Sequence, residues 1–469
     1  MRVVLVNPSM GAYYRHSKVA AAITLSPPLN LGLLAGALRR AGHSVILWDL
    51  EAEDPSASDP ADLERRFAKV RPDMVGVSFR TPLFPQAKTI AAAARKACPS
   101  ALIIAGGVHP STRPEQTLEK ADFDVAVRGE GDHSILELAD GVAFNDIQGI
   151  THRSGSTADR PLHMELDNLA MGAWDLFDLN RYQMPSLVAK TVPVADLEFS
   201  RGCRAQCVYC TKGVFGSTWR HKSPDRFVAE LSHAKAHGFR AFNLVDDSFT
   251  TITSRAIATC EEMMRQRLDM PWSLTNGIRV ANVNEDFFRI ARAAGCRLLA
   301  FGFESGSDEV LQRIKKGATV AQARRAVAWA RKYGFTILGY FMVGLPGETP
   351  ETIRETAQFA ADLDVDFAKF SITMPLPGTP LWHEWARHID MDTVDFSIHN
   401  SGNHLYEHPD FSWPELQAHT RAAYRTFYGR PKYVARRVMR AMRNKELTQQ
   451  LRYSAELGTG GLMEAFQRR

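Results

Sequence analysis

The chain has 469 residues, of which 45% are hydrophobic and 23% are charged. This globular composition excludes a disordered, collagen-like or small disulfide-stapled protein. The formal net charge of +5 is too small for this length to indicate nucleic-acid binding without a clustered basic stripe. No apolar run approaches the roughly 20 residues that span a bilayer, and the short apolar start predicts a buried strand rather than a secretory signal.

Residues 1–140 alternate short apolar runs with segments that have helical periodicity. Continuous runs of Val, Ile and Leu are typical of parallel strands that are buried on both faces. We therefore predict an α/β domain with a doubly wound parallel sheet, flavodoxin-like or Rossmann-like, that binds ligands at the carboxyl ends of its strands. The expected strands are Val3–Val6, Ser44–Trp48, Met74–Ser78, Leu102–Ala105 and Val125–Val127, and the expected helices are Leu31–Arg40, Asp62–Val70, Gln86–Ala97 and Pro114–Glu119.

Residues 141–192 are rich in Gly, Asp, Ser and Pro, which predicts a linker with little regular structure. Its aromatic residues near Trp174 and Phe177 indicate that it docks against the rest of the chain.

Residues 193–382 repeat a strand-then-helix pattern six times, which is two units short of a full eightfold barrel. Residues 383–469 form a helical carboxyl-terminal region, with an amphipathic stretch around Leu416–Tyr428 and a basic tail. The expected barrel strands are Leu197–Ser200, Ala241–Val245, Trp272–Leu274, Arg297–Phe303, Thr336–Val343 and Phe367–Thr373.

Three cysteines, Cys203, Cys207 and Cys210, lie within eight residues just after the first expected barrel strand, where barrel active sites are built. Three thiolates at this spacing can bind one polynuclear iron–sulfur cluster and leave one iron open for a substrate or cofactor. The alternative is a structural zinc site completed by a histidine such as His221, although such sites more often use paired Cys-x-x-Cys units. The low cysteine density predicts a reducing, cytoplasmic compartment.

The segment Cys203–Cys210, with Tyr209 before its last cysteine, resembles the signature of the radical S-adenosylmethionine (SAM) superfamily. The resemblance implies a [4Fe–4S] cluster on the three cysteines, SAM on the open iron, and its cleavage to a 5′-deoxyadenosyl radical. Motifs at the ends of later strands resemble the family's SAM contacts. Each alone is typical of a turn or helix cap, but their recurrence at successive strand ends favours a SAM site. With Tyr209, the implied contacts are Asp246, Asp247, Glu304, Ser305, Gly339 and Gly344.

The first domain resembles the cobalamin-binding domains that precede many radical SAM barrels. Glycines follow its fourth and fifth expected strands, and glycines at strand ends let the backbone approach a large ligand. The chain is thus similar to the cobalamin-binding branch of the superfamily, the class B methylase-like enzymes. The implied cobalamin contacts are Arg80, Gly106, Gly107, Val108, His109, Gly129 and Glu130.

One departure concerns the Asp-x-His-x-x-Gly motif, whose histidine binds cobalt in some relatives. The motif is absent here. Asp132 and His133 do not fit it, because they are adjacent and the motif has one residue between its aspartate and its histidine. The resemblance then implies cobalamin without a protein imidazole on cobalt, with Arg80 either under the corrin or serving as a surface or phosphate-pairing arginine. The histidines expected to form hydrogen bonds rather than to bind cobalt are His16, His43, His109 and His133.

The resemblance implies methylation of an unactivated carbon, or of a phosphinate phosphorus, in a small-molecule metabolite. One SAM would methylate the cobalamin and a second would supply the radical that abstracts a substrate hydrogen, so the two domains must face one cavity. A first alternative is radical cyclisation or oxidative rearrangement without net methyl transfer, as in tetrapyrrole ring-forming relatives. An alternative of another class is a cobalamin sensor or an iron–sulfur electron carrier.

The expected partners are a small-molecule substrate, such as a lipid or tetrapyrrole, and an electron donor such as flavodoxin or ferredoxin. No nucleic acid is expected. A basic stretch near the carboxyl end is more often a solvated face, but it is also able to lie on anionic lipid. Its residues are Lys432, Arg436, Arg437, Arg440, Arg443 and Lys445.

Overall fold

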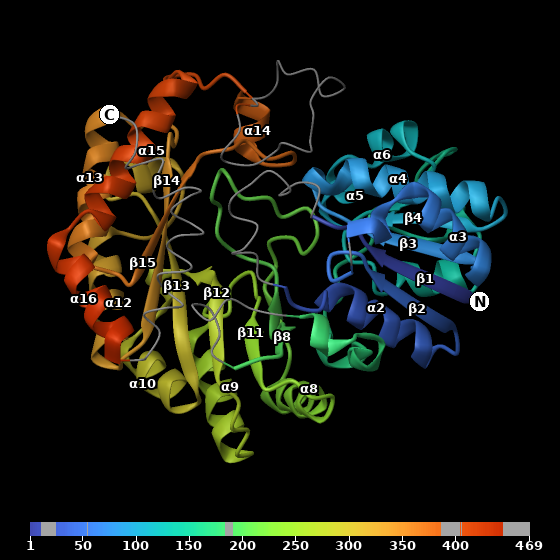
Figure 1. Cartoon of the computed structure of the whole chain (residues 1–469), viewed down its shortest axis with the longest axis horizontal. Coiled ribbons are helices and arrows are strands. Elements are labelled where there is room, and N and C mark those ends of the chain that lie inside the picture. Colours follow the sequence, from blue (N-terminus) through green and yellow to red (C-terminus); the bar gives the residue numbers. More distant parts are fainter. Residues whose placement is uncertain (11–24, 54, 183–190, 386–403, 405, 444–469) are drawn as a thin grey trace.

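The computed structural model describes residues 1–10, 25–53, 55–182, 191–385, 404 and 406–443. It contains two α/β units, each built on its own sheet of mainly parallel strands (Figure 1). His16 and Lys445, both considered in the sequence analysis, lie outside the described residues.

The first unit is the predicted doubly wound sheet, with strand order β2-β1-β3-β4-β5-β6-β7. Its first five strands lie where the sequence predicts them. Side chains of the expected apolar runs fill cores on both faces, which is why these runs lack polar alternation. Helices α3, α4 and α6 cover one face, and α2 and α7 cover the other. The bounds are β1 (Arg2–Asn7), α2 (Leu29–Arg40), β2 (Ser44–Asp49), α3 (Pro60–Val70), β3 (Met74–Ser78), α4 (Phe84–Ala97), β4 (Leu102–Gly106), α5 (Val108–Thr112), α6 (Pro114–Lys120), β5 (Val125–Val127) and α7 (Ser134–Ala139).

The expected linker 141–192 requires a correction, because part of it belongs to the first sheet. Strands β6 (Ile150–His152) and β7 (Gly155–Ser156) form a hairpin that pairs antiparallel with β5. These strands have two or three residues and no apolar run, so periodicity does not reveal them. Further along, Trp174 and Phe177 are buried in the core of the second unit, which confirms that this segment docks.

The second unit is a six-stranded parallel sheet in the order β15-β14-β13-β12-β11-β8, the predicted partial (β/α)6 barrel. Its two edge strands, β8 and β15, do not pair with each other, so the barrel is open. The first strand begins earlier than expected, and Ser200–Arg201 instead forms β9, which pairs with β10 (Arg220–His221). The bounds are β8 (Val194–Leu197), α8 (Pro224–Ala236), β11 (Ala241–Leu244), α9 (Thr253–Arg265), β12 (Trp272–Ile278), α10 (Glu285–Ala293), β13 (Cys296–Glu304), α11 (Asp308–Arg313), α12 (Val320–Lys332), β14 (Thr336–Val343), α13 (Pro350–Leu363) and β15 (Phe367–Ile372).

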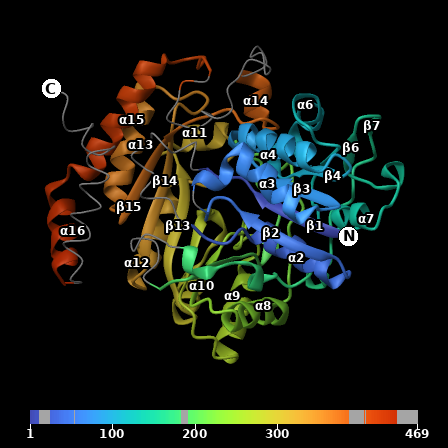
Figure 2. The same cartoon turned by 45° about the vertical axis from the view of Figure 1, so that its right-hand side comes forward.

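The carboxyl-terminal helices α14 (Pro380–Trp385), α15 (Trp413–Tyr428) and α16 (Pro431–Arg443) confirm the predicted helical region (Figure 2). Helix α15 lies against β15, where the hydroxyls of Tyr424 and Tyr428 hydrogen-bond the backbone of that edge strand. In α16, Arg436 is not free in solvent, because its Nη2 lies 3.0 Å from the Asp364 carboxylate.

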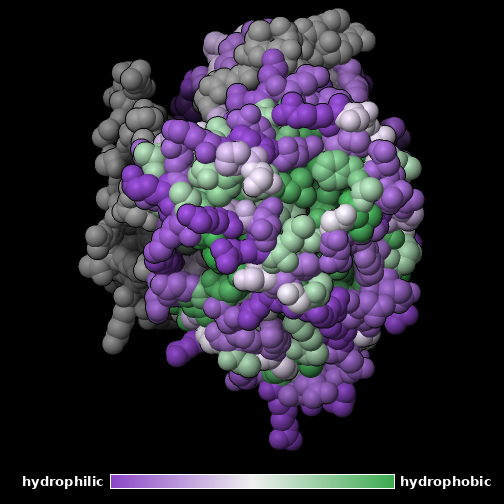
Figure 3. Space-filling view, turned by 90° about the vertical axis from the view of Figure 1, so that its right-hand side faces the viewer, coloured by the Kyte–Doolittle hydropathy of each residue, from purple (hydrophilic) through white to green (hydrophobic). Residues whose placement is uncertain are grey.

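Within the described residues, no helix combines the length and the apolar character needed to cross a bilayer. Figure 3 shows the side of the first unit that faces away from the barrel. This face is mostly hydrophilic, with hydrophobic residues in separate patches. Such patches are ordinary on a protein surface.

Candidate functional site

A cavity of about 680 Å³ lies between the two units, a size typical of small-molecule and cofactor sites. The first unit contributes the residues that follow its strands β1, β3, β4 and β5, which is the ligand-binding edge of a doubly wound sheet. The second unit contributes Arg201 on β9, the loop that follows β9, and Asp247 after β11. The expected arrangement, in which both units face one cavity, is therefore present. Lining residues include Asn7, Ser78, Arg80, Gly106, Gly107, Val108, Gly129, Glu130, Arg201, Cys203, Cys210, Lys212, Phe215 and Asp247.

The three clustered cysteines lie on this loop, and Cys203 and Cys210 line the cavity. Cys207 is buried, whereas Cys210 is exposed toward the cavity. Desolvation by the cavity walls, followed by the neighbouring Cys207 and Cys203 thiols, raises the pKa of Cys210 to about 11. The thiols are thus close enough to repel one another as thiolates, and a bound cation would relieve that repulsion.

The arrangement fits a polynuclear cluster better than a single ion. In the described part of the chain, no three His, Cys, Asp or Glu side chains converge closely enough to hold one metal ion. His221, the candidate fourth ligand of the alternative zinc site, packs its ring on Phe199 and Trp219, and its Nδ1 lies 2.8 Å from the Lys222 carbonyl oxygen. A four-iron cluster spreads three thiolates over three different irons, so its ligands need not converge on one point.

Two aspartates after β11 fix the backbone around the cysteine loop. Asp247 Oδ2 accepts a 3.0 Å hydrogen bond from the N–H of Gly202, the residue before Cys203. Asp246 is buried and accepts from the Phe199 N–H at 2.7 Å and from the Ser200 hydroxyl. Burial raises the pKa of Asp246 to about 7. The carboxylate of Asp246 is therefore engaged with the protein, whereas Asp247 also lines the cavity.

Tyr209 is joined to the end of β13 through a lysine. Lys316 Nζ lies 2.7 Å from Glu304 Oε1 and 3.4 Å from the Tyr209 hydroxyl. Glu304 sits at a register shift between β13 and β14 with a φ of 65°, a conformation that turns its side chain out of the strand alternation. Burial, with the Glu304 charge as the next cause, raises the pKa of Tyr209. The structure thus brings Tyr209 and Glu304 together beside the cysteine loop.

The remaining expected SAM residues contact other parts of the protein. Ser305 is fully buried, and its hydroxyl lies 3.1 Å from Thr356 Oγ1 on α13. Gly339 lies inside β14, where a Cβ would be 2.7 Å from the Phe341 ring. Gly344 has a φ of 78°, and its carbonyl lies 3.0 Å from His408 Nε2.

On the opposite wall, the loops after β4 and β5 bring backbone close to the cavity. Gly107 has a φ of 101°, and a Cβ there would lie 2.6 Å from the Phe79 carbonyl oxygen. A Cβ on Gly106 would instead point into open space. Arg80 also lines the cavity, with Nη2 at 3.1 Å from Met10 Sδ. This wall has the open backbone that a large planar ligand requires.

Two family models match the chain. Residues 197–360 match the model described as "Radical SAM superfamily", and residues 19–139 match "B12 binding domain". A relative, the uncharacterized methyltransferase PH0819 of Pyrococcus horikoshii, is 32% identical over 421 residues, covering 87% of this chain and 89% of the relative. The chain is a radical SAM protein with a B12-binding domain. The resemblance seen in the sequence is thereby confirmed.

Another relative of this radical SAM protein is named a cyclase rather than a methyltransferase. The anaerobic magnesium-protoporphyrin IX monomethyl ester cyclase of Cereibacter sphaeroides is 28% identical over 443 residues, covering 91% of this chain and 70% of the relative. A solved structure of the radical SAM methyltransferase TsrM from Kitasatospora setae, with cobalamin and a [4Fe–4S] cluster bound, covers 90% of each chain with a TM-score of 0.70 and 21% identity. At that identity the likeness establishes a shared fold.

Some residues of the B12-binding domain lie elsewhere than their motifs suggest. His109 is fully buried, with its ring 4.5 Å from that of Phe84, and it is not among the residues that line the cavity. Glu130 lines the cavity but accepts hydrogen bonds from Arg201, Arg220 and the His163 N–H. His133 and His43, by contrast, have the polar contacts expected of them: His133 Nε2 lies 2.9 Å from His163 Nδ1, and His43 Nε2 lies 3.1 Å from Asp140.

Sequence reasoning missed a polar row across three barrel strands. Asn243 on β11 donates to Asp196 on β8 at 3.1 Å and accepts from Thr275 on β12 at 2.8 Å. Ser26, from the first domain, donates to the other Asp196 oxygen at 2.5 Å. The available signal was a carboxylate within an otherwise apolar strand, since buried strands rarely carry a charge. Lys316, Arg201 and Arg220 were also missed.

Proposed function

We propose that the chain is a cobalamin-dependent radical SAM methyltransferase that methylates an unactivated carbon, or a phosphinate phosphorus, of a small molecule. One observation carries the proposal: Cys203 and Cys210 face the open glycine loops of the B12-binding domain across a single cavity. The names of the Pyrococcus and Kitasatospora relatives support methyl transfer over other radical chemistry.

When bound, the cluster and SAM supply a carbon radical, and the cobalamin supplies the methyl group. The chain supplies ligands, orientation and exclusion of water. Cys203, Cys207 and Cys210 would hold the cluster, and Asp247 fixes the loop through Gly202. The walls on both sides confine the substrate between the two cofactors, so that the reactive groups meet the substrate and not solvent.

We assign the SAM side to Tyr209, Glu304 and Asp247, which lie around the cysteine loop. The Lys316 ammonium holds Glu304 beside Tyr209 and leaves the second carboxylate oxygen of Glu304 for a ligand amine or hydroxyl. Asp246, Ser305, Gly339 and Gly344 would act indirectly, by fixing the strand ends that carry these groups.

We assign the cobalamin side to Arg80, Gly106, Gly107, Val108 and Gly129, all of which line the cavity. The buried imidazole of His109 packs under this wall and would support the loop without binding cobalt.

The test is anaerobic incubation with methyl-labelled SAM, candidate substrates and dithionite as the electron donor. We expect label in the product, with one S-adenosylhomocysteine and one 5′-deoxyadenosine formed per methylation. Cys207→Ala should abolish 5′-deoxyadenosine formation, because three thiolates are needed to hold the cluster. Cys98→Ala, at a buried cysteine that does not line the cavity, is the matched control and should retain 5′-deoxyadenosine formation. Zinc in the anaerobically prepared protein, or full radical production by Cys207→Ala, would refute the proposal.

The second candidate is radical cyclisation or rearrangement, favoured by the cyclase relative of similar coverage. The same labelling experiment separates the two, since a cyclase forms 5′-deoxyadenosine without transferring label. A cobalamin sensor or electron carrier would form no 5′-deoxyadenosine.

Finer assignments complete the proposal. The protein acts in the cytoplasm on a small molecule, such as a lipid or tetrapyrrole, and takes electrons from a flavodoxin or ferredoxin. Helix α16 would contact anionic membrane if the substrate is a lipid. Retention on vesicles of anionic phospholipid should then be lost when Lys432, Arg437, Arg440 and Arg443 are replaced by Gln, with Arg436 kept because it pairs with Asp364.

A further inference from the structure

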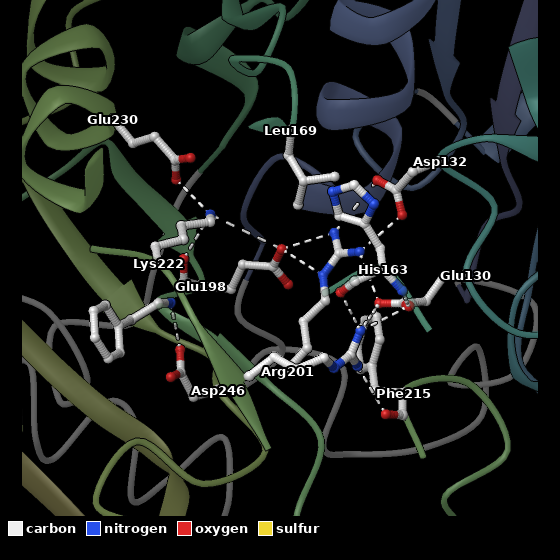
Figure 4. A network of polar contacts seen from close by, with 12 residues as sticks. Glu130, Asp132, His163, Leu169, Glu198, Arg201, Phe215, Lys222, Glu230 and Asp246 are labelled. Carbon is white, nitrogen blue, oxygen red and sulfur yellow. Dashed lines mark hydrogen bonds and ion pairs between the residues drawn. The ribbon is translucent and has the colours of Figure 1, made fainter. Parts of the chain in front are cut away.

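A buried ionic network joins the two cofactor-binding units (Figure 4). Its centre is Arg201, on β9 of the barrel, whose side chain is 4% exposed. Arg201 Nε lies 2.8 Å from Glu198, and its Nη1 lies 3.1 Å from Glu130 and 2.8 Å from Asp132. Glu198 belongs to the barrel, whereas Glu130 and Asp132 belong to the loop after β5 of the B12-binding domain. One guanidinium thus binds carboxylates of both units.

A second arginine reinforces the same junction. Arg220 on β10 is 2% exposed, and its Nη1 lies 2.9 Å and 2.8 Å from the two Glu130 oxygens. Glu130 also accepts from the His163 N–H at 2.9 Å. The charge of Glu130 is therefore satisfied within the protein. This explains why a residue of the glycine motif that lines the cavity is not free to bind a ligand.

Both ends of the junction adjoin a cofactor loop. Arg201 lies two residues before Cys203, and the Gly129–Asp132 stretch lines the cavity opposite. Gly202, between Arg201 and Cys203, is itself held by Asp247. A shift of the loop after β5 therefore acts on Arg201, and through the short backbone connection on the first cysteine.

We propose that Arg201, bound to Glu130 and Asp132, is a positioning residue that couples cobalamin binding to the conformation of the cluster loop. This inference rests on the proposed cofactors. Ordering either loop stabilises the shared carboxylate–guanidinium geometry, so each cofactor raises the affinity for the other by the same factor. The contacts of Arg201 with Glu130 and Asp132 also orient the two cofactor loops toward one substrate. Charged, fork-shaped arginine contacts suit this task because they fix direction as well as distance.

The test titrates hydroxocobalamin into the anaerobically purified chain, with and without its reconstituted cluster, and follows absorbance. In the wild type, the cluster should lower the cobalamin Kd by about fivefold or more. Glu130→Gln keeps the shape but removes the charge, and it should bring the ratio of the two Kd values close to one. The electron paramagnetic resonance spectrum of the reduced cluster should change on cobalamin addition in the wild type and not in Glu130→Gln.

Glu230→Gln is the matched control. Glu230 is also a buried carboxylate of this network, but it pairs with Lys222 and Arg226 inside the barrel. It should keep the wild-type ratio. If Glu130→Gln does not fold, Asp132→Asn serves instead, because it retains the Glu130–Arg220 contact and should still reduce the ratio.

Three results would overturn the inference: a ratio near one in the wild type, an unchanged ratio in the folded variant, or equal loss in Glu230→Gln. If the chain binds no hydroxocobalamin, with or without the cluster, the proposed function itself is contradicted. Binding without coupling would contradict only the role of Arg201.

Discussion

Gly202→Ala tests whether the cysteine loop depends on one backbone conformation. Gly202 has a φ of 83°, in the left-handed region, which costs an alanine roughly 1–2 kcal/mol. A Cβ there would lie 2.3 Å from the Thr218 carbonyl oxygen and 3.1 Å from that of Phe215. Because both atoms are backbone, no side-chain rotation relieves the clash, and the loop itself must move. We expect a loss of unfolding free energy above about 2 kcal/mol and displacement of Cys203.

Gly334→Ala separates the two contributions. Gly334 belongs to the same barrel and has a φ of 73°, but its Cβ would meet no atom within 4 Å. It should show the backbone penalty alone. Denaturant unfolding gives the stability, and iron and sulfide content after anaerobic reconstitution gives the cluster. Gly202→Ala should retain little cluster, whereas Gly334→Ala retains it fully. A wild-type cluster content and equal stability in both variants would refute the reasoning.

Two further predictions concern stability. Burial raises the pKa of Glu348 from 4.5 to about 7, so the folded state disfavours its ionised form. Protonated Glu348 therefore stabilises the folded state at low pH, and this contribution is lost as the pH rises. The free energy of unfolding should fall by about 3 kcal/mol between pH 4.5 and 7. Glu348→Gln should remove that part of the pH dependence in urea unfolding, and parallel curves for the two proteins would contradict it. Tyr424→Phe should cost about 1–3 kcal/mol and speed hydrogen exchange at the Phe370 amide, since the Tyr424 hydroxyl binds both backbone groups of Phe370. Tyr333→Phe removes a hydroxyl that binds the exposed Glu285, and it should change neither the stability nor the hydrogen exchange at Phe370. Equal effects in the two variants would contradict the prediction that Tyr424 protects the edge strand β15.

The parallel strands could be predicted from the sequence because their apolar runs record burial on both faces. Met74–Ser78, Val125–Val127 and Thr336–Val343 coincide with the observed strands. The hairpin of β6 and β7 could not be predicted, because neither strand has an apolar run. Pairing with β5 defines β6, and pairing with β6 defines β7. The start of β8 was missed by three residues for a related reason. Asp196 interrupts its apolar run, and its partners Asn243 and Ser26 are distant in sequence.

In the candidate site too, the features that could be predicted are the ones with a local sequence pattern. The cysteine spacing and the glycines at strand ends are local signals, and the structure places Cys203, Cys210, Gly107 and Gly129 around one cavity. Motif position alone does not reveal where a charged side chain points.

Glu130 shows this limit clearly. It lies within a glycine motif beside the cavity, yet its carboxylate binds Arg201 and Arg220. These arginines follow Glu130 in the chain by 71 and 90 residues, respectively. The engagement of Asp246 with Phe199, 47 residues earlier, is likewise a product of tertiary structure.

The missing quarter of the barrel has a physical substitute. In the described structure, β8 pairs with one strand only, so its other edge needs cover. The segment that enters α2 supplies part of it: Leu25 and Leu29 pack against the barrel core, and Ser26 hydrogen-bonds Asp196 on β8. The first domain therefore does more than carry one wall of the cavity. It also covers part of the open edge of the barrel at β8, the strand that leads toward the cysteine loop.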